Sequence, residues 1–298
     1  MRRIIGKDKK GRSVLINVPS YDEIYVNNQF GLLTAYDIAI SSNGSGSADA
    51  SAAASGTQKA IFGYGYTIMA VSMTNLVSNT GVVATDTTGV GTARRLLAAA
   101  GYGSDKAIFG YGYVAASVSM TNKVSNTGVV ATDTIGVGTA RQQLAAAGYG
   151  SDKAIFGYGY GSGAETSITN LVSNTGVVAT DTVGVGTARY SLAAAGYGSD
   201  KAIFGYGNSD ISGVVSITNL VSNTGIVTNN VSGVGTPRRD LAAAGYGTDK
   251  AIFGYGSNSS FAVVSMTNLV SNTGVVATDT TGVGTARQQL AAAGYSLS

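Results

Sequence analysis

Short runs of alternating apolar and polar residues, separated by Gly, Ser, Asn and Asp, recur five times along the chain. In the second recurrence this alternation predicts four strands, over residues 97–102, 106–111, 119–125 and 129–134. Gly-Ser-Asp at 103–105 and Asn-Thr-Gly at 126–128 predict tight turns that join the strands in pairs. Each recurrence therefore predicts a unit of four antiparallel strands.

The recurrences are copies of one repeat that begins at Lys-Ala-Ile-Phe-Gly-Tyr-Gly. The copies start at Lys59, Lys106, Lys153, Lys201 and Lys250, which lie 47, 47, 48 and 49 residues apart. The extra residues enter between the second and third strands. Four-stranded units at this spacing are typical of a β-propeller, in which each unit forms one blade. The sequence thus predicts an all-β fold, with a five-bladed propeller over residues 59–298.

The two ends of the repeat array are complementary. The last copy ends on Leu-Ala-Ala-Ala-Gly-Tyr at 290–295, a first strand with no second strand after it, whereas the first copy opens on a second strand. Residues 50–55 hold the position of a first strand but lack its Leu, Gly and Tyr. We expect residues 290–295 to supply the inner strand of the blade built from residues 59–88, which closes the ring.

The N-terminal region differs from the repeats. Residues 1–40 contain short segments that favour extended structure, such as 13–18 and 24–26, and predict a docking arm. Residues 41–58 have the small, polar composition of a linker. Residues 1–12 carry six of the 19 basic residues against one Asp, a charge that suits an acidic partner or a solvated tail, and no apolar segment resembles a signal peptide or membrane span.

Composition excludes several classes of site. The chain has no Cys and no His, so it cannot form a disulfide, a thiolate metal site or a histidine-based catalytic triad. Glu23 and Glu165 are the only glutamates, and the repeated aspartates have equivalent surroundings, whereas an acid and base pair needs different ones. We expect no enzyme activity, cofactor or metal, and no nucleic-acid binding by the propeller.

The repeat resembles the kelch repeat, in which an Arg-led segment enters the first strand and the second strand ends in a glycine pair. The matching residues are Gly-Thr-Ala-Arg, two free positions, Leu-Ala-Ala-Ala, a turn and Lys-Ala-Ile-Phe-Gly-Tyr-Gly. Gly-Tyr-Gly replaces the glycine pair, and the usual Trp is absent. The FGYG and SNTGVVATDT segments also resemble repeats of bacteriophage virion proteins, which implies an arm docked on the particle and a displayed repeat domain.

Two sets of positions vary between the copies, the segment between the second and third strands and the two residues after each repeated Arg. A propeller places both sets on one face, where they would form a binding surface or be merely unconstrained. The candidate binding residues are Tyr66, Tyr113, Tyr160, Glu165, Asn208, Asp210, Asn258, Phe261, Arg95, Gln142, Tyr190, Arg239 and Gln288.

Three further sets of repeated residues admit two readings each. A ring formed by Arg94, Arg141, Arg189, Arg238 and Arg287 could hold an anion, although repeated arginines more often pack between blades. The Gly-Tyr-Gly tyrosines, such as Tyr102 and Tyr111, could stack on sugars, although packing between blades is commoner. Asp86, Asp133, Asp181 and Asp279 favour turn chemistry over metal binding, because the fourth copy has Asn230.

These features lead us to expect a virion protein assembled in the host cytoplasm, a tail fibre, baseplate or appendage component. Residues 1–40 would dock to other virion proteins, and the propeller face would bind a host-surface glycan or protein. The alternative is a multivalent lectin with a sugar pocket between each pair of blades. A purely structural decoration is the third possibility.

Overall fold

The structure, a computed structural model, describes residues 2–7, 13–18, 23–24, 33–34 and 59–294. The chain divides into two compact regions, an N-terminal region of residues 1–58 with 297–298 and a repeat domain of residues 59–296, and each is described by itself. The expected linker at 41–58, the position at 50–55 and Tyr295 lie outside the described residues. Within the described ranges every regular element is a strand, so the fold is all-β as predicted. No helix in these ranges is long and apolar enough to cross a membrane.

The N-terminal region contains two antiparallel pairs of strands. β1 (Arg2–Lys7) pairs with β2 (Ser13–Val18), so the extended segment expected at 13–18 is confirmed. β3 (Glu23–Ile24) pairs with β4 (Leu33–Thr34). Of the segment expected at 24–26, the structure describes only Ile24.

The repeats form five main antiparallel sheets, one for each copy, which we call units 1–5, and three small two-stranded sheets. Unit 1 is β5 (Ala60–Tyr66) and β6 (Ala70–Val77). Units 2 and 3 are β7 (Ala98–Tyr102), β8 (Lys106–Gly110) and β9 (Thr121–Val124), then β10 (Ala145–Tyr149), β11 (Lys153–Gly157) and β14 (Thr169–Val172). Units 4 and 5 are β15 (Ala193–Tyr197), β16 (Lys201–Gly205) and β19 (Thr218–Val221), then β21 (Ala242–Tyr246), β22 (Lys250–Gly254) and β24 (Thr267–Val270).

The first three predicted strands of each complete copy are therefore confirmed, in the order in which they follow one another along the chain. The turn between the first two uses a left-handed residue that is not glycine, Ser104, Ser151, Ser199 or Thr248, followed by the repeated Asp. In units 2–5 the middle strand pairs on both edges, which explains its apolar composition.

The fourth predicted strand is wrong as a regular element. In unit 2, residues 129–134 meet β9 only at two isolated bridges, Val124 with Val130 and Thr121 with Thr134, whose register differs by one residue. The side chain of Asn122 causes the interruption, because its Nδ2 donates to the carbonyl of Ala131 and to Asp133. A side chain thus takes a position that a strand ladder would give to backbone.

The variable segment between the second and third strands has structure that the sequence did not predict. In unit 3 it forms a small hairpin of β12 (Tyr160–Gly161) and β13 (Ala164–Glu165). In unit 4 it forms β17 (Asn208–Ser209) and β18 (Gly213–Val214). In unit 5, β23 (Ser257–Asn258) pairs instead with β20 (Arg238–Arg239), which lies before the first strand.

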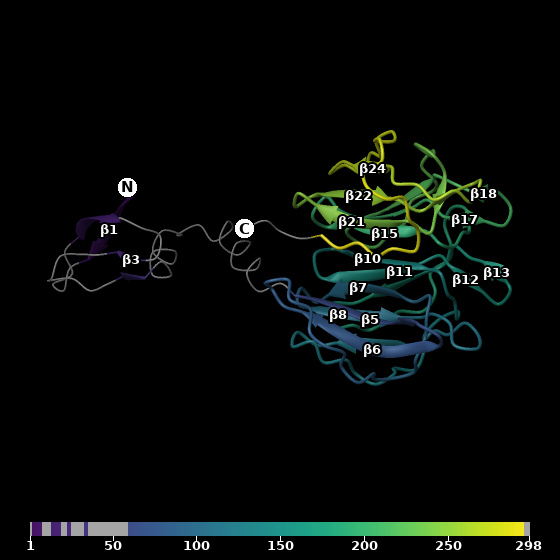
Figure 1. Cartoon of the computed structure of the whole chain (residues 1–298), viewed down its shortest axis with the longest axis horizontal. Helices are drawn as coiled ribbons and strands as arrows, with labels where there is room; N and C mark the ends of the chain where they lie inside the picture. The colour runs from purple at the N-terminus through teal and green to yellow at the C-terminus, as the bar shows by residue number, and fades with distance from the viewer. Residues whose placement is uncertain (1, 8–12, 19–22, 25–32, 35–58, 295–298) are drawn as a thin grey trace. The chain divides into compact units, whose positions relative to one another are not determined.

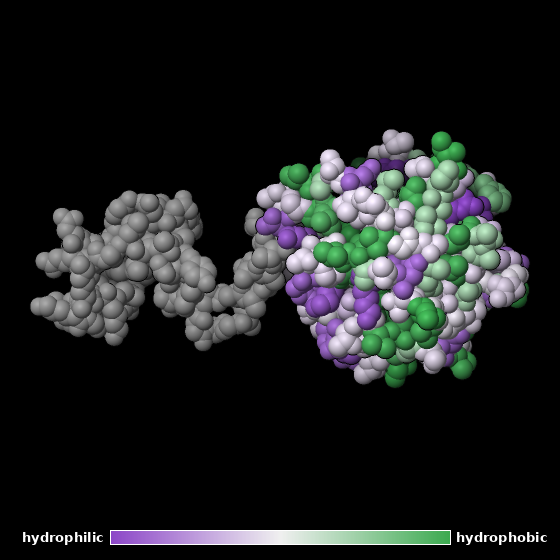
Figure 2. Space-filling model, turned by 90° about the horizontal axis from the view of Figure 1, so that it is seen from below, coloured by the Kyte–Doolittle hydropathy of each residue, from purple (hydrophilic) through white to green (hydrophobic). Residues whose placement is uncertain are grey.

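The hydrophobic core lies between units rather than within them. One cluster joins Ala147, Ile155 and Tyr158 of unit 3 to Leu192 and Phe204 of unit 4, and the next cluster repeats it between units 4 and 5. Figure 1 shows the resulting order, with β5 and β6 at one end of the repeat domain and β24 at the other. Apolar side chains gather in small groups on the face shown in Figure 2. Ile68, Met69 and Phe62 are among the exposed large apolar residues of the repeat domain.

The expected ring closure is not found in the described residues. β5 pairs only with β6, and residues 290–294 form no strand with it. Gly294 nevertheless lies beside Gly245, in the way that Gly245 lies beside Gly196 and Gly196 beside Gly148. The C-terminal segment therefore continues the row of first strands, but the structure leaves the last junction open.

Candidate functional site

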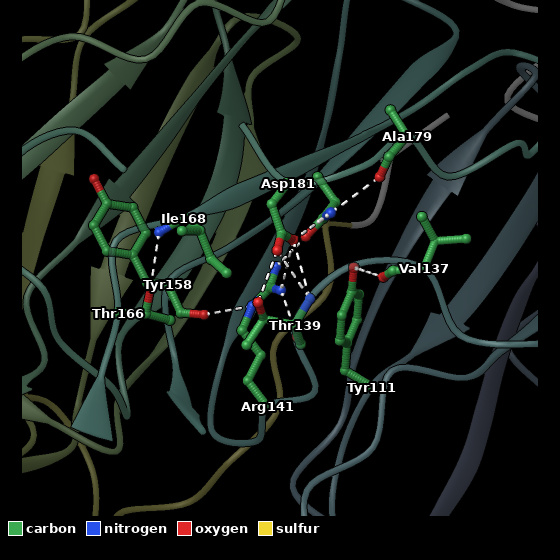
Figure 3. A network of polar contacts seen from close by, with 10 residues as sticks. Tyr111, Val137, Thr139, Arg141, Tyr158, Thr166, Ile168, Ala179 and Asp181 are labelled. Carbon is green, nitrogen blue, oxygen red and sulfur yellow. Dashed lines mark hydrogen bonds and ion pairs between the residues drawn. The ribbon is translucent and has the colours of Figure 1, made fainter. Parts of the chain in front are cut away.

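The repeated arginine sits in the junction between two units, as Arg141 illustrates (Figure 3). Its guanidinium lies 4.2 Å from the ring centroid of Tyr111 in unit 2. Its Nε donates to the carbonyl of Tyr158 and its Nη2 to Oδ1 of Asn170, both in unit 3, at 2.8 and 2.6 Å. The Arg141 side chain is fully buried. This single residue therefore fastens two units to each other.

Equivalent arginines occupy three other junctions, and two of them make the same contacts. Arg94 and Arg189 repeat the donation to a tyrosine carbonyl and to an asparagine, Asn122 or Asn219. Arg238 donates to Asn268 and to the carbonyl of Met266, while its buried Nε has no acceptor. All these side chains are sealed from solvent. The possible central anion ring is therefore corrected at these four positions, since their guanidinium groups are buried and bonded within the protein.

The repeated aspartate also forms hydrogen bonds across the junction. Asp181 of unit 3 accepts hydrogen bonds from the backbone N–H and the hydroxyl of Thr139 and from Asn170. Burial alone would raise the pKa of Asp181, but the hydrogen bonds from Asn170 and Thr139, with the charge of Arg141, lower it below its ordinary value. The sequence favoured turn chemistry for this aspartate, whereas its bonds to Thr139 reach across the junction to a residue 42 positions earlier in the chain. The described residues contain no group of three acidic side chains placed to hold a metal.

Asn230 shows why the fourth copy tolerates the loss of this charge. Its Oδ1 accepts from the backbone N–H of Thr187, like the aspartates, while its Nδ2 donates to Thr187 Oγ1. The hydroxyl has changed from donor to acceptor, so both contacts persist.

The tyrosines of the Gly-Tyr-Gly motif also belong to the junctions. Tyr158 is fully buried, packs at 5.1 Å against the ring of Phe204, and donates its hydroxyl to the carbonyl of Val185. Burial raises the pKa of the equivalent Tyr111 to about 12. These rings are unavailable to a sugar, which favours the packing interpretation for them.

The residues that would form a junction between unit 5 and unit 1 are present on both sides, but the two sets do not contact each other in the described residues. Arg287 stacks on Tyr255, but the only hydrogen bond of its side chain in the described part of the chain is to the carbonyl of Thr285. On unit 1, Phe62 is 55% exposed, whereas the equivalent Phe156 and Phe204 are fully buried. Asn75 and Asp86, which match Asn170 and Asp181, bond to each other.

The two variable sets do lie together in the structure. The residue after four of the five repeated arginines forms a backbone bridge with the first residue of the variable segment. The bridged pairs are Arg95 with Tyr113, Gln142 with Tyr160, Tyr190 with Asn208, and Arg239 with Ser257. Asn258 pairs with Arg238, one residue earlier. Gln288 has no such partner in the described residues. Sequence reasoning had grouped these positions by predicted face alone.

Neighbouring variable segments contact each other in units 3 and 4. Glu165 accepts hydrogen bonds from Ser209 Oγ and from the backbone N–H of Asp210. Tyr160 packs edge-on against Tyr190 at 5.4 Å, and Tyr190 accepts a hydrogen bond from Asn208. Burial raises the pKa of Tyr190, and the charge of Asp210 adds to that effect. Glu165 is thus engaged in holding two loops together.

Arginine and aromatic side chains meet at two places on this variable surface. Arg95 lies 4.5 Å from the ring centroid of Tyr66 and 5.4 Å from that of Tyr113. Arg239 lies 4.6 Å from the ring centroid of Phe261, which is 72% exposed and has a left-handed backbone with φ of 62°. A left-handed aromatic residue is strained, and such strain often occurs at binding sites.

Sequence reasoning missed the junction asparagines and threonines. Asn122, Asn170, Asn219 and Asn268 are fully buried and orient the guanidinium groups. The signal for the asparagines was the unvarying Thr-Asn pair in every copy, which was assigned only to a strand, and the threonines lie in the repeated Gly-Thr-x-Arg segment.

No protein-family model matches the sequence, and no curated protein matches it significantly.

Proposed function

We propose that the chain is a non-enzymatic component of a phage virion, in a tail fibre, baseplate or surface appendage. In this proposal residues 1–40 dock to other virion proteins, and the repeat units present a binding face to a host-surface glycan or protein. The observation that carries the display role is the backbone pairing of variable residues, such as Arg95 with Tyr113 and Tyr190 with Asn208, on an otherwise constant scaffold.

The fold that goes with this proposal is a five-bladed, kelch-like propeller. Four junctions with equivalent Arg and Tyr contacts support it, because each unit meets the next in the same way. The free halves at the two ends match each other. Arg287 and Thr285 correspond to Arg141 and Thr139, and Asn75 and Asp86 correspond to their partners. In the closed ring these halves form the fifth junction.

The virion setting rests on the resemblance of the FGYG and SNTGVVATDT segments to phage repeats. The basic residues at positions 2–12 give the N-terminal region the charge to meet an acidic partner. The pairing of β1 with β2 gives it an ordered element for docking.

Deletion of residues 1–40 tests the docking role. Particles would be produced with the full chain and with the deleted chain, purified, and analysed by mass spectrometry. We expect the deletion to abolish incorporation. An R239Q chain, altered only in the repeat region, serves as the matched control and should be incorporated normally. Normal incorporation of the deleted chain would contradict the proposal.

A multivalent lectin remains the second candidate, and the exposed aromatic rings of Tyr66 and Phe261 favour it. Nearly identical pockets at the Gly-Tyr-Gly motifs are not available to it, since Tyr111, Tyr158 and Tyr206 are buried. Titration of the full chain with glycans distinguishes the candidates. About five equivalent sites per chain, together with unaltered particles after deletion of residues 1–40, would favour the lectin.

A further inference from the structure

Arg95 occupies a place between tyrosines of two units. Tyr66 belongs to unit 1 and Tyr113 to unit 2, and the guanidinium carbon of Arg95 lies within 4.5 and 5.4 Å of their ring centroids. Two backbone hydrogen bonds, of 3.1 and 2.8 Å, fix Arg95 against Tyr113. The cation is therefore held in position by both units.

The guanidinium edge of Arg95 has no partner. Within residues 59–294, the Arg95 side chain makes no hydrogen bond and no ion pair, whereas the adjacent Arg94 uses Nε, Nη1 and Nη2. Stacking on aromatic rings engages the faces of a guanidinium group and leaves its N–H groups, which lie in the plane, free to donate. A carboxylate or phosphate accepts from such a group through two parallel hydrogen bonds.

No other unit offers the same combination. The equivalent positions hold Gln142, Tyr190, Arg239 and Gln288. Arg239 is the only other cation among them, and it already has a carboxylate at 3.7 Å, that of Asp240. A free, ordered positive charge therefore occurs once on the variable surface.

The surroundings of Arg95 select for a ligand with an apolar face beside its anion. Tyr66 is 57% exposed, and Ile68 and Met69, which follow it in the same variable segment, are 90% and 69% exposed. An aromatic ring packs well against the C–H face of a sugar and contributes little against a small hydrated ion.

We propose that Arg95, Tyr66 and Tyr113 bind a carboxylate-bearing saccharide, with the sugar acid accepting from Arg95 and the sugar ring lying against Tyr66. This inference rests on the proposed function of the variable surface in host recognition and gives that surface a ligand class. It requires one site per chain rather than five.

Oligogalacturonate and its fully methyl-esterified form provide matched probes, because esterification adds a methyl group to each carboxyl and removes its charge while the sugar rings stay the same. Calorimetric titration of the full chain should show at least about tenfold tighter binding of the acid form. R95Q should remove that preference and leave binding of the ester unchanged. The variant should fold, because Gln already occupies the same position in two other copies. K59Q, which removes an exposed cation outside the variable surface, should bind both probes like the unmodified chain.

Equal affinity of the unmodified chain and R95Q for oligogalacturonate would overturn the site, as would no binding by either. If inorganic phosphate at the same concentration displaces oligogalacturonate, the site binds oxyanions in general, and the proposal of a saccharide ligand is overturned. Incorporation of R95Q into particles separates the two proposals. If the unmodified chain and R95Q both enter particles and R95Q loses saccharide binding, the virion proposal and the saccharide site are both supported. If neither chain enters particles and R95Q still loses saccharide binding, only the saccharide site is supported.

Discussion

The ring of Phe204 lies directly over the backbone of Gly157. A β-carbon placed on Gly157 would lie 2.6 Å from Cζ of Phe204, well inside van der Waals contact. The same relation joins Gly110 to Phe156 and Gly205 to Phe253. The second strand of each of these units thus needs a glycine because the phenylalanine of the following unit fills the space of a side chain.

Gly157→Ala should therefore destabilise the repeat domain. The added methyl group displaces the fully buried ring of Phe204, and overpacking of this kind costs about 1–3 kcal/mol of the free energy of unfolding. Urea denaturation of the full chain measures the loss. Gly148→Ala is the control, since its β-carbon would meet only carbonyl oxygens at 3.6 Å. Equal stability of the two variants would contradict the packing argument.

Gly254→Ala tests whether the ring closes. In the open arrangement a β-carbon on Gly254 would contact only Thr267, at 3.2 Å, because no phenylalanine covers it. In the closed ring Phe62 covers Gly254 as Phe204 covers Gly157. We expect closure, so Gly254→Ala should lower the urea midpoint as much as Gly157→Ala does. A near-neutral Gly254→Ala, with an equally neutral Phe62→Ala, would rule closure out.

Arg141→Gln should be among the most damaging single changes. It removes a buried cation and leaves the carbonyl of Tyr158 and the Oδ1 of Asn170 without their donor. Breaking a buried charged network of this kind costs about 3 kcal/mol or more. Calorimetric unfolding measures the effect. R95Q makes the same chemical change at a partly exposed residue and should shift stability by less than about 0.5 kcal/mol. Similar losses for both would contradict the junction role.

The junction aspartates should make stability depend on acid. The pKa of Asp181 is lowered in the folded chain, so its contribution is fully present above its unfolded pKa of about 3.9 and is lost as pH falls through the folded value. Asp181→Asn should reduce the fall in unfolding free energy between about pH 5 and pH 2. Asn230→Asp should increase it, since it adds a carboxylate beside Thr187 and Arg189. If the unfolding free energies of the unmodified chain, Asp181→Asn and Asn230→Asp fall in parallel with pH, the junction aspartates are not the source of the acid dependence.

The sequence predicted those elements whose signals are local. Strands such as β7 and β8 followed from alternation and the Gly-Ser-Asp turn signal at 103–105, and both were confirmed. The fourth strand failed because alternation cannot show that the side chain of Asn122, from a neighbouring strand, bonds to Ala131 in place of backbone. Such substitution depends on contacts between segments rather than on residue spacing.

The candidate site was predictable in outline only. Variation between copies marked Arg95 and Tyr113 as surface positions, but nothing in the spacing showed that Arg95 lies between two aromatic rings. The arginine one residue earlier carries the same chemistry and is fully buried. Burial, which decides between the two, depends on how consecutive units pack.

A row of backbone hydrogen bonds runs across the units. Gln143 donates to Leu96, Ser191 to Gln143, Asp240 to Ser191 and Gln289 to Asp240. Each member has a left-handed backbone whatever its side chain. This backbone hydrogen bond between units thus forms whichever residue occupies the position. In-frame recombination between the near-identical copies would add or remove a unit and keep the same hydrogen bond between the units that become neighbours. Recombination between copies can therefore exchange one variable segment for another in a single step while this row of hydrogen bonds is kept.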